Sequence, residues 1–519
     1  MIATVLSGAL VVDGTGAAAR HADVTIAGGE IVAIGDPHTA RGDARVDLDG
    51  LVLSPGFIDL HAHSDLTRFA YPTGDTRVLQ GITTEVVGNC GLSPAPTSGG
   101  GFRDAIATID VVPSVPLNWE TPAEYLDALA SLPAAWNIAP LLGHGSVRRA
   151  VMGDATGAAT ADQRAQMARI VTGALAAGYW GMSYGLMYAP GELSDVAELE
   201  ELAATIAAAD ALAGVHLRSY DPSGLAAAVD EMISIAEATG VRLQISHLRS
   251  IADPDGTALD AALARIRATT ADVAADAYPY LAGHTTALQL MPPALRARGT
   301  REILAEITAR RDALADELRS SVMFPPAAIT IVRAGEGDAP EVGHTLDELQ
   351  ASDPAGRDWA LILLDILAAH GGAVDTIVVG TRPQDAARVL AEPYVSVASD
   401  GVALGLGHAL NRPHPRSIGT FPRAMREVAD AGMPLETIVA KMTSQPADRL
   451  GLRSRGRIAV GSAADLVAFD PATVRDLAGY DNPLVAPAGI ERVWVAGECV
   501  ARAGVVTGNL PGVLLRRTR

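Results

Sequence analysis

Short hydrophobic stretches that end in polar residues recur along the whole chain. Each stretch has the length of a buried strand, and each ends in a side chain able to bind a metal ion or a substrate. The eight stretches are residues 51–63, 81–90, 137–144, 178–184, 212–216, 241–247, 272–278 and 394–400. Alanine-rich segments with helical periodicity lie between most of them, and Gly240 stands where a helix C-cap glycine is expected.

This alternation of strand and helix, repeated eight times, predicts a (β/α)8 barrel of the α/β class. In such a barrel the active site lies at the carboxyl ends of the strands, where these polar residues fall. A chain of 519 residues is longer than a bare barrel requires, so we expect a further structural unit.

The two chain ends share a pattern of short strands and turns. We expect residues 1–54 and 457–519 to pair into one small β-sandwich domain, with the barrel, residues 55–456, inserted between its halves. A long excursion at approximately residues 284–390 contains a charged helical segment near 301–320 and strand-like segments at 329–332 and 376–379. It predicts an inserted subdomain or lid.

Charge and composition narrow the classes of partner. The formal net charge of -20 argues against nucleic acid or an anionic membrane, because a phosphate-binding surface needs a cationic face. The chain has no uninterrupted apolar run of eighteen residues, and its amino terminus lacks the basic segment of a signal peptide. Its two cysteines, Cys90 and Cys499, would form at most one disulfide. A cytoplasmic protein is expected, and the oligomeric state stays open.

His61 and His63 close the first stretch and are the first candidates for a metal site. Residues two apart in a strand point to the same face, so both imidazoles can face one ion. Such a pair alone is as often a solvated strand end as a metal site. Candidate ligands at the ends of other strands strengthen the metal interpretation, namely Cys90, His216, His247 and Asp400.

Several segments together resemble the N-acyl-D-amino-acid deacylases of the amidohydrolase superfamily. The likeness runs in order over nearly the whole chain, and its most specific part contains Asn89-Cys90-Gly91. It is carried by Pro55-Gly56-Phe57-Ile58-Asp59-Leu60-His61-Ala62-His63, Gly88-Asn89-Cys90-Gly91-Leu92-Ser93-Pro94-Ala95-Pro96, Ser399-Asp400-Gly401, His414-Pro415-Arg416 and Gly419-Thr420-Phe421-Pro422-Arg423. The resemblance implies a zinc enzyme that hydrolyses the amide between an acyl group and a D-amino acid.

The ligand types agree with this implication. A thiolate and imidazoles suit zinc, so Cys90, His216 and His247 are the expected ligands of one tightly bound ion. His61, His63 and Asp400 would complete this site or hold a weaker second ion. Many amidohydrolases bridge two metals with a carboxylated lysine near the fourth strand. The only lysine here, Lys441, lies beyond the eighth strand, so Cys90 is expected to take that place.

The resemblance also implies roles in catalysis and substrate binding. Asp400 is the candidate base, which takes a proton from water and passes it to the leaving amine. Arg249, Arg416 and Tyr278 are the candidates for binding the substrate carboxylate, since arginine recognises carboxylates bidentately. Tyr188 is expected to wall the pocket or to pack against the lid. His144 is expected either to orient the acyl group or to be a hydrogen-bonded structural histidine.

Three functions remain open from the sequence. The first is hydrolysis of N-acyl-D-amino acids, with the small-molecule substrate as partner and an apolar side chain favoured, because no further cationic group can be assigned to an acidic one. The second is a D-specific dipeptidase or a cyclic-amide hydrolase on the same barrel. The third is an inactive amidohydrolase-like scaffold, which the filled ligand positions argue against. The D configuration rests wholly on the resemblance.

Overall fold

The predicted strands close into an eight-stranded parallel barrel in the computed structural model, which describes residues 2–97, 115, 117–153, 155–296, 298–408 and 412–518. Each barrel strand pairs with the next barrel strand, β15 with β19 across the inserted residues, and β10 and β11 form one barrel strand interrupted at Leu141. The strands are β8 (Phe57–Asp59), β9 (Ile82–Val87), β10 (Asn137–Pro140), β11 (Leu142–Gly143), β12 (Gly181–Gly185), β13 (Leu212–His216), β14 (Arg242–Ile245), β15 (Val273–Ala277) and β19 (Val395–Val397). A parallel bridge between Ala62 and Gly401 joins the last strand to the first. The barrel expectation is confirmed.

Helices surround the barrel in the order that the alanine-rich segments predict. Asp195 caps α7 by accepting a hydrogen bond from the backbone N–H of Glu198, and Gly240 ends α8 at a φ of 72°. Thr160 forms a capping box at the start of α6. The barrel helices are α4 (Pro122–Ala130), α5 (His144–Met152), α6 (Ala161–Ala177), α7 (Val196–Ala208), α8 (Leu225–Thr239), α9 (Thr257–Ala268), α14 (Pro383–Ala391), α15 (Arg416–Asp430), α16 (Leu435–Met442) and α17 (Ser444–Leu450).

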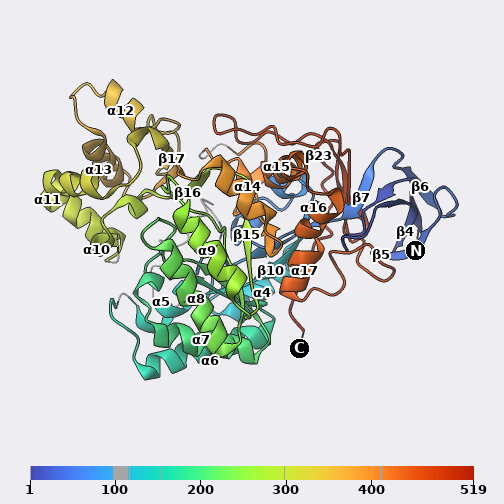
Figure 1. The fold of residues 1–519 in the computed structure, drawn as a ribbon, viewed down its shortest axis with the longest axis horizontal. Coiled ribbons are helices and arrows are strands. Elements are labelled where there is room, and N and C mark those ends of the chain that lie inside the picture. The colour runs from blue at the N-terminus through green and yellow to red at the C-terminus, as the bar shows by residue number, and fades with distance from the viewer. Residues whose placement is uncertain are drawn as a thin grey trace.

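Strands from both chain ends form a β-sandwich beside the barrel, at the right of Figure 1. One sheet has the order β23-β22-β21-β20-β7-β2-β3, in which β20 (Leu466–Phe469) from the tail runs antiparallel to β7 (Val52–Pro55). The other has the order β5-β4-β1-β6, and a shared core that includes Leu6, Leu53 and Trp494 packs between the two. The remaining strands are β1 (Thr4–Ser7), β2 (Leu10–Val11), β3 (Arg20–His21), β4 (Asp23–Ala27), β5 (Glu30–Gly35), β6 (Ala44–Asp47), β21 (Ile490–Val495), β22 (Glu498–Arg502) and β23 (Val505–Val506).

The excursion after the seventh barrel strand forms a unit with its own hydrophobic core, which projects to the upper left in Figure 1. Its antiparallel sheet has the order β16-β18-β17, and α11 kinks at Arg310. Its elements are β16 (Ala282–Thr286), α10 (Pro293–Arg296), α11 (Thr300–Ser321), β17 (Ile329–Ala334), α12 (Leu346–Ser352), α13 (Trp359–Ala369) and β18 (Val374–Val379). Helix α14 follows this unit and packs on β15 and β19 of the barrel. The domain limits given above stay a proposal.

No helix among the described residues has both the length and the apolar character needed to cross a membrane.

Candidate metal centre and substrate pocket

The carboxyl ends of five barrel strands bring the six predicted metal ligands together. His61 and His63 follow β8, Cys90 follows β9, His216 ends β13, His247 follows β14, and Asp400 follows β19. Their donor atoms form two overlapping groups in which all atoms lie within 4.8 Å of one another. One group is His61, His63, Cys90 and Asp400, and the other is Cys90, His216 and His247. Cys90 is common to both groups.

Distances around the Cys90 sulfur show how closely the donors converge. Its Sγ lies 3.3 Å from His61 Nε2, 3.5 Å from His216 Nδ1 and 3.5 Å from His247 Nε2. Asp400 Oδ1 lies 3.1 Å from His63 Nε2 and 3.5 Å from His61 Nε2. These side chains have little exposed surface, so a soft sulfur and several nitrogens face one another at the inner end of a pocket. This donor set fits zinc.

Three of the six predicted ligand residues have a left-handed backbone conformation. The φ angles are 54° at Cys90, 35° at His247 and 51° at Asp400. Residues other than glycine rarely adopt positive φ, and such strained positions cluster at active sites. Each of the three lies where a strand has just ended, so the sharp turn directs the side chain into the centre instead of along the strand.

Electrostatics favour the ligand forms of Cys90 and His216 and the protonated form of His63. Burial alone would raise the pKa of the Cys90 thiol, but the neighbouring His61 and His216 outweigh it and hold that pKa well below its usual range. Burial lowers the pKa of His216 to about 4, which leaves its imidazole neutral. Burial would also lower the pKa of His63, but its hydrogen bonds to Asp400 and Cys90 raise it to about 10. The anionic forms of Cys90 and Asp400 are therefore favoured in a buried site, where the protonated His63 supplies positive charge that a bound metal ion would supply instead.

Asp276 supports two of the metal-ligand candidates from behind. Its Oδ1 accepts a 2.7 Å hydrogen bond from the backbone N–H of His247 and lies 3.5 Å from His61 Nδ1. Gln244 donates to its other oxygen at 3.0 Å. A carboxylate near the ring nitrogen of a metal-binding histidine raises its basicity, so Asp276 can act on the His61 ring while it holds His247 through the backbone. Sequence reasoning missed Asp276, although it lies in the seventh stretch two residues before Tyr278.

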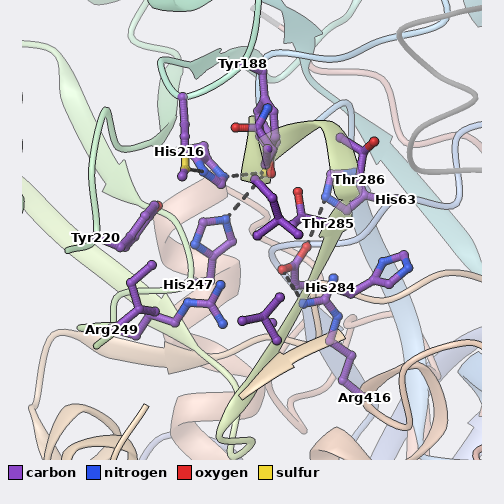
Figure 2. A pocket seen from close by; sticks show the side chains of 18 of the residues that line it. His63, Tyr188, His216, Tyr220, His247, Arg249, His284, Thr285, Thr286 and Arg416 are labelled. Atoms are coloured by element: carbon purple, nitrogen blue, oxygen red, sulfur yellow. Dashed lines mark hydrogen bonds and ion pairs between the residues drawn. The ribbon is translucent and has the colours of Figure 1, made fainter. Parts of the chain in front are cut away.

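A pocket opens beside the metal-ligand candidates, and Figure 2 shows most of the side chains that line it. The described lining includes His63, Cys90, His216, His247 and Asp400, together with the predicted substrate-binding residues Tyr188, Arg249 and Arg416. Tyr188 packs on the ring of His216 with centroids 4.6 Å apart. Tyr278 lies behind the two arginines, and its hydroxyl accepts hydrogen bonds from Arg249 and, at 3.2 Å, from Arg416. Apolar walls come from Leu92, Met187, Ile251, Leu290, Phe324 and Val378.

The inserted unit supplies part of this pocket, which the sequence did not predict residue by residue. Gly283, His284, Thr285 and Thr286 of β16 all line it. Burial and the nearby Arg416 lower the pKa of His284 to about 3, so this imidazole is neutral. A lid was expected here, but which residues of an inserted sheet face the barrel depends on how the two units pack.

His144 does not line this pocket. It is fully buried, and its Nε2 lies 2.7 Å from Glu198 Oε1. Arg148 pairs with the other oxygen of Glu198. This environment resembles the structural alternative, and the role of His144 in substrate binding stays a prediction. Lys441 lies at the opposite end of the barrel from the metal-ligand candidates, where it donates to the carbonyl of Val395 at the start of β19.

Comparison with known proteins finds a matching family and similar relatives. A model described as the amidohydrolase family matches residues 44–501. A D-aminoacylase of Alcaligenes xylosoxydans xylosoxydans is 35% identical over 99% of this chain and 97% of its own length. An N-acyl-D-glutamate deacylase of the same organism is 36% identical over 99% of this chain and 96% of its own length.

A solved structure extends the comparison to three dimensions. The crystal structure of N-acyl-D-glutamate deacylase from Bordetella bronchiseptica, complexed with zinc and a phosphonate inhibitor that mimics the tetrahedral intermediate, matches with a TM-score of 0.84. The match covers 99% of this chain and 100% of that chain at 32% identity. With the family model spanning most of its residues, the chain belongs to the amidohydrolase family.

Proposed function

We propose that this protein is a zinc-dependent hydrolase that cleaves the amide bond of N-acyl-D-amino acids, releasing a carboxylate and a free D-amino acid. One observation carries the proposal: the Cys90, His216 and His247 group lies in the same pocket as Asp400 and two arginines. The D configuration is supported by the relatives, which are a D-aminoacylase and an N-acyl-D-glutamate deacylase.

Cys90, His216 and His247 would hold one zinc ion, and His61, His63 and Asp400 would complete the site or hold a weaker second ion. Zinc bound there would supply Lewis acidity, which polarises the scissile carbonyl and makes water more acidic. The protein contributes the orientation of the donors through Asp276 and a buried environment in which charge interactions are strong.

Asp400 is the residue that moves the proton. Burial would raise the pKa of its carboxyl group, but Arg416 and His63 outweigh burial and hold that pKa well below its usual range, so the group is ionised at neutral pH. Its Oδ1 faces the histidines and its Oδ2 lies 2.8 Å from Arg416 Nη1. Asp400 would accept the proton of the attacking water and deliver it to the leaving amine nitrogen, which would otherwise depart as a poor anion.

Arg249 has the features of a receptor for the substrate carboxylate. No carboxylate of the described residues forms an ion pair with it, whereas Arg416 is already paired with Asp400. Its Nε is buried and has no hydrogen-bond partner in the described part of the chain, and its Nη1 donates to the Tyr278 hydroxyl. An arginine left unpaired beside the reacting groups can bind a carboxylate bidentately. Arg416 donates to the same Tyr278 hydroxyl and would therefore lie close to the same substrate carboxylate.

The binding partner and the cellular location are proposed as well. The relatives are named for small N-acylated amino acids, and we propose such a molecule as the partner, with neither nucleic acid nor membrane. The net charge of -20 supports this restriction. We propose the cytoplasm as the location, which the near absence of cysteine supports.

The test combines zinc content with amine release from paired N-acetyl-D- and N-acetyl-L-amino acids. The wild type should bind zinc and release amine from the D series alone. Asp400→Asn should abolish the release, whereas the surface control Asp448→Asn should leave it unchanged. Bound zinc without release from either series would contradict the deacylase proposal, and dipeptides and cyclic amides would then be assayed. Absence of bound zinc would support an inactive scaffold.

A further inference from the structure

Gly283 lies against the guanidinium of Arg249 with no space for a side chain. A Cβ atom at this position would come within 2.4 Å of Arg249 Nη2, 2.7 Å of Nη1 and 2.9 Å of Cζ. The backbone does not require glycine here, because Gly283 is not among the residues with positive φ. The close approach of Arg249 is therefore the constraint at this position.

The guanidinium of Arg249 lies in a slot with aromatic rings on its other sides. Its Cζ is 5.5 Å from the ring centroid of Tyr278 and 6.0 Å from that of Tyr220. Tyr278 also accepts a hydrogen bond from Nη1. Gly283 belongs to β16 of the inserted unit, where it pairs with Val378 of β18, so the rim of the slot formed by Gly283 is a sheet backbone.

We infer that Gly283 is a positioning residue that sets where the carboxylate-binding guanidinium of Arg249 lies. The inference rests on the proposed function, because it assigns the substrate carboxylate to Arg249. Arg249 follows β14 of the barrel, and its guanidinium packs against the backbone of β16 in the inserted unit. Besides the side chains that line the pocket, the inserted unit would thus take part in substrate binding through a backbone contact.

The three atoms nearest to the Cβ that Gly283→Ala adds all belong to the far end of the flexible Arg249 side chain. The variant should therefore fold, with the guanidinium pushed out of its slot. A displaced guanidinium loses charge-assisted hydrogen bonds to the substrate carboxylate, so we expect KM to rise roughly tenfold to 100-fold. We expect kcat to change much less, because the same contact is lost in the ground state and in the transition state.

A double-mutant cycle with Arg249→Lys separates this role from general damage to the sheet. Lysine lacks the Cζ, Nη1 and Nη2 atoms that the new methyl group would meet. Gly283→Ala should therefore raise KM in the wild-type background and have little further effect in the Arg249→Lys background. Equal rises of KM in both backgrounds would overturn the inference. Gly173→Ala is the control, since a Cβ there meets nothing within 4 Å, and it should change neither constant.

A crystal structure of Gly283→Ala tests the geometry independently of turnover. A guanidinium displaced from between Tyr220 and Tyr278 supports the inference, and a guanidinium in its wild-type place overturns it. If the wild type releases no amine from any N-acyl-D-amino acid, the proposed function fails, while the crystal structure still decides whether Gly283 positions Arg249. If the wild type is active and KM of Gly283→Ala is unchanged, the inference alone fails.

Discussion

The backbone N–H of Asp400 donates a 2.7 Å hydrogen bond to the carbonyl of His61. Two residues on, His63 donates its own N–H to the carbonyl of Gly401 at 2.8 Å. These bonds join the eighth barrel strand to the first. The barrel therefore closes at the residues that are proposed to bind metal and to transfer the proton. A change in the pairing of these two strands would displace those side chains.

We expect Asp59 to stabilise the pairing of the eighth barrel strand with the first, and Asp59→Asn should lower the stability of the protein. Its carboxylate accepts a 2.9 Å hydrogen bond from the Ser399 N–H and pairs with the fully buried Arg77. Removing one partner of a buried ion pair costs about 3–5 kcal/mol, so the unfolding temperature should fall clearly. Differential scanning calorimetry measures this. The surface variant Asp448→Asn is the control, and an unchanged transition in Asp59→Asn would contradict the assigned role.

Cys90→Ser should remove tightly bound zinc. The thiolate is the donor common to both ligand groups, and a serine hydroxyl at neutral pH is a far poorer zinc ligand. After dialysis, elemental analysis should find little zinc in the variant, and its kcat/KM should fall by at least roughly 100-fold. Cys499→Ser, in the small β domain, should keep zinc and activity. Full zinc retention in Cys90→Ser would remove Cys90 from the ligand set.

Lys441 should titrate far below an ordinary lysine. Burial lowers its pKa to about 8, although its ammonium donates to the carbonyls of Glu392 and Val395. Because the chain has no other lysine, 13C-labelled lysine gives a single Cε resonance whose pH titration reports this pKa directly. A midpoint at the ordinary value of 10.5 would contradict the expectation.

The lowered pKa of Lys441 makes the stability of the protein depend on pH. From about pH 8 to 10.5 the unfolded chain binds a proton at Lys441 that the native protein does not, so rising pH should stabilise the native protein across this window. Below about pH 8 both states are protonated and the gain is absent. Lys441→Met should lose this rise, which thermal unfolding of both proteins at pH 7, 8, 9 and 10 will show. Parallel curves for the two proteins would contradict it.

His144→Gln should affect stability more than substrate binding. Burial would raise the pKa of Glu198, but its hydrogen bond with His144 and the charges of His144 and Arg148 lower it to about 2. Loss of the His144 contact should cost about 1–3 kcal/mol and lower the unfolding temperature. KM should stay within about twofold, whereas Arg249→Gln should raise it at least about tenfold. A rise of KM in His144→Gln comparable to that in Arg249→Gln would place His144 in substrate binding instead.

Strand ends were the most informative part of the sequence. All eight predicted stretches contain barrel strands. A buried strand is apolar, so the sequence alone reveals both the strand and the polar residue that ends it. The six ligand candidates follow from the same pattern, and their convergence in space agrees with it. Asp276 was missed because a carboxylate inside a strand has no signal that distinguishes a support for histidines from an ordinary buried acid.

The sequence by itself determined the barrel, the pairing of the chain ends and the residue types able to bind zinc, because periodicity and side-chain chemistry are local properties. Only the tertiary structure decided that β16 of the inserted unit lines the pocket, that Gly283 leaves space for Arg249, and that His144 faces Glu198. It also showed the left-handed turns that direct Cys90 and Asp400 inward. These features depend on contacts between segments far apart in the chain, and the sequence pattern carries no signal for such packing.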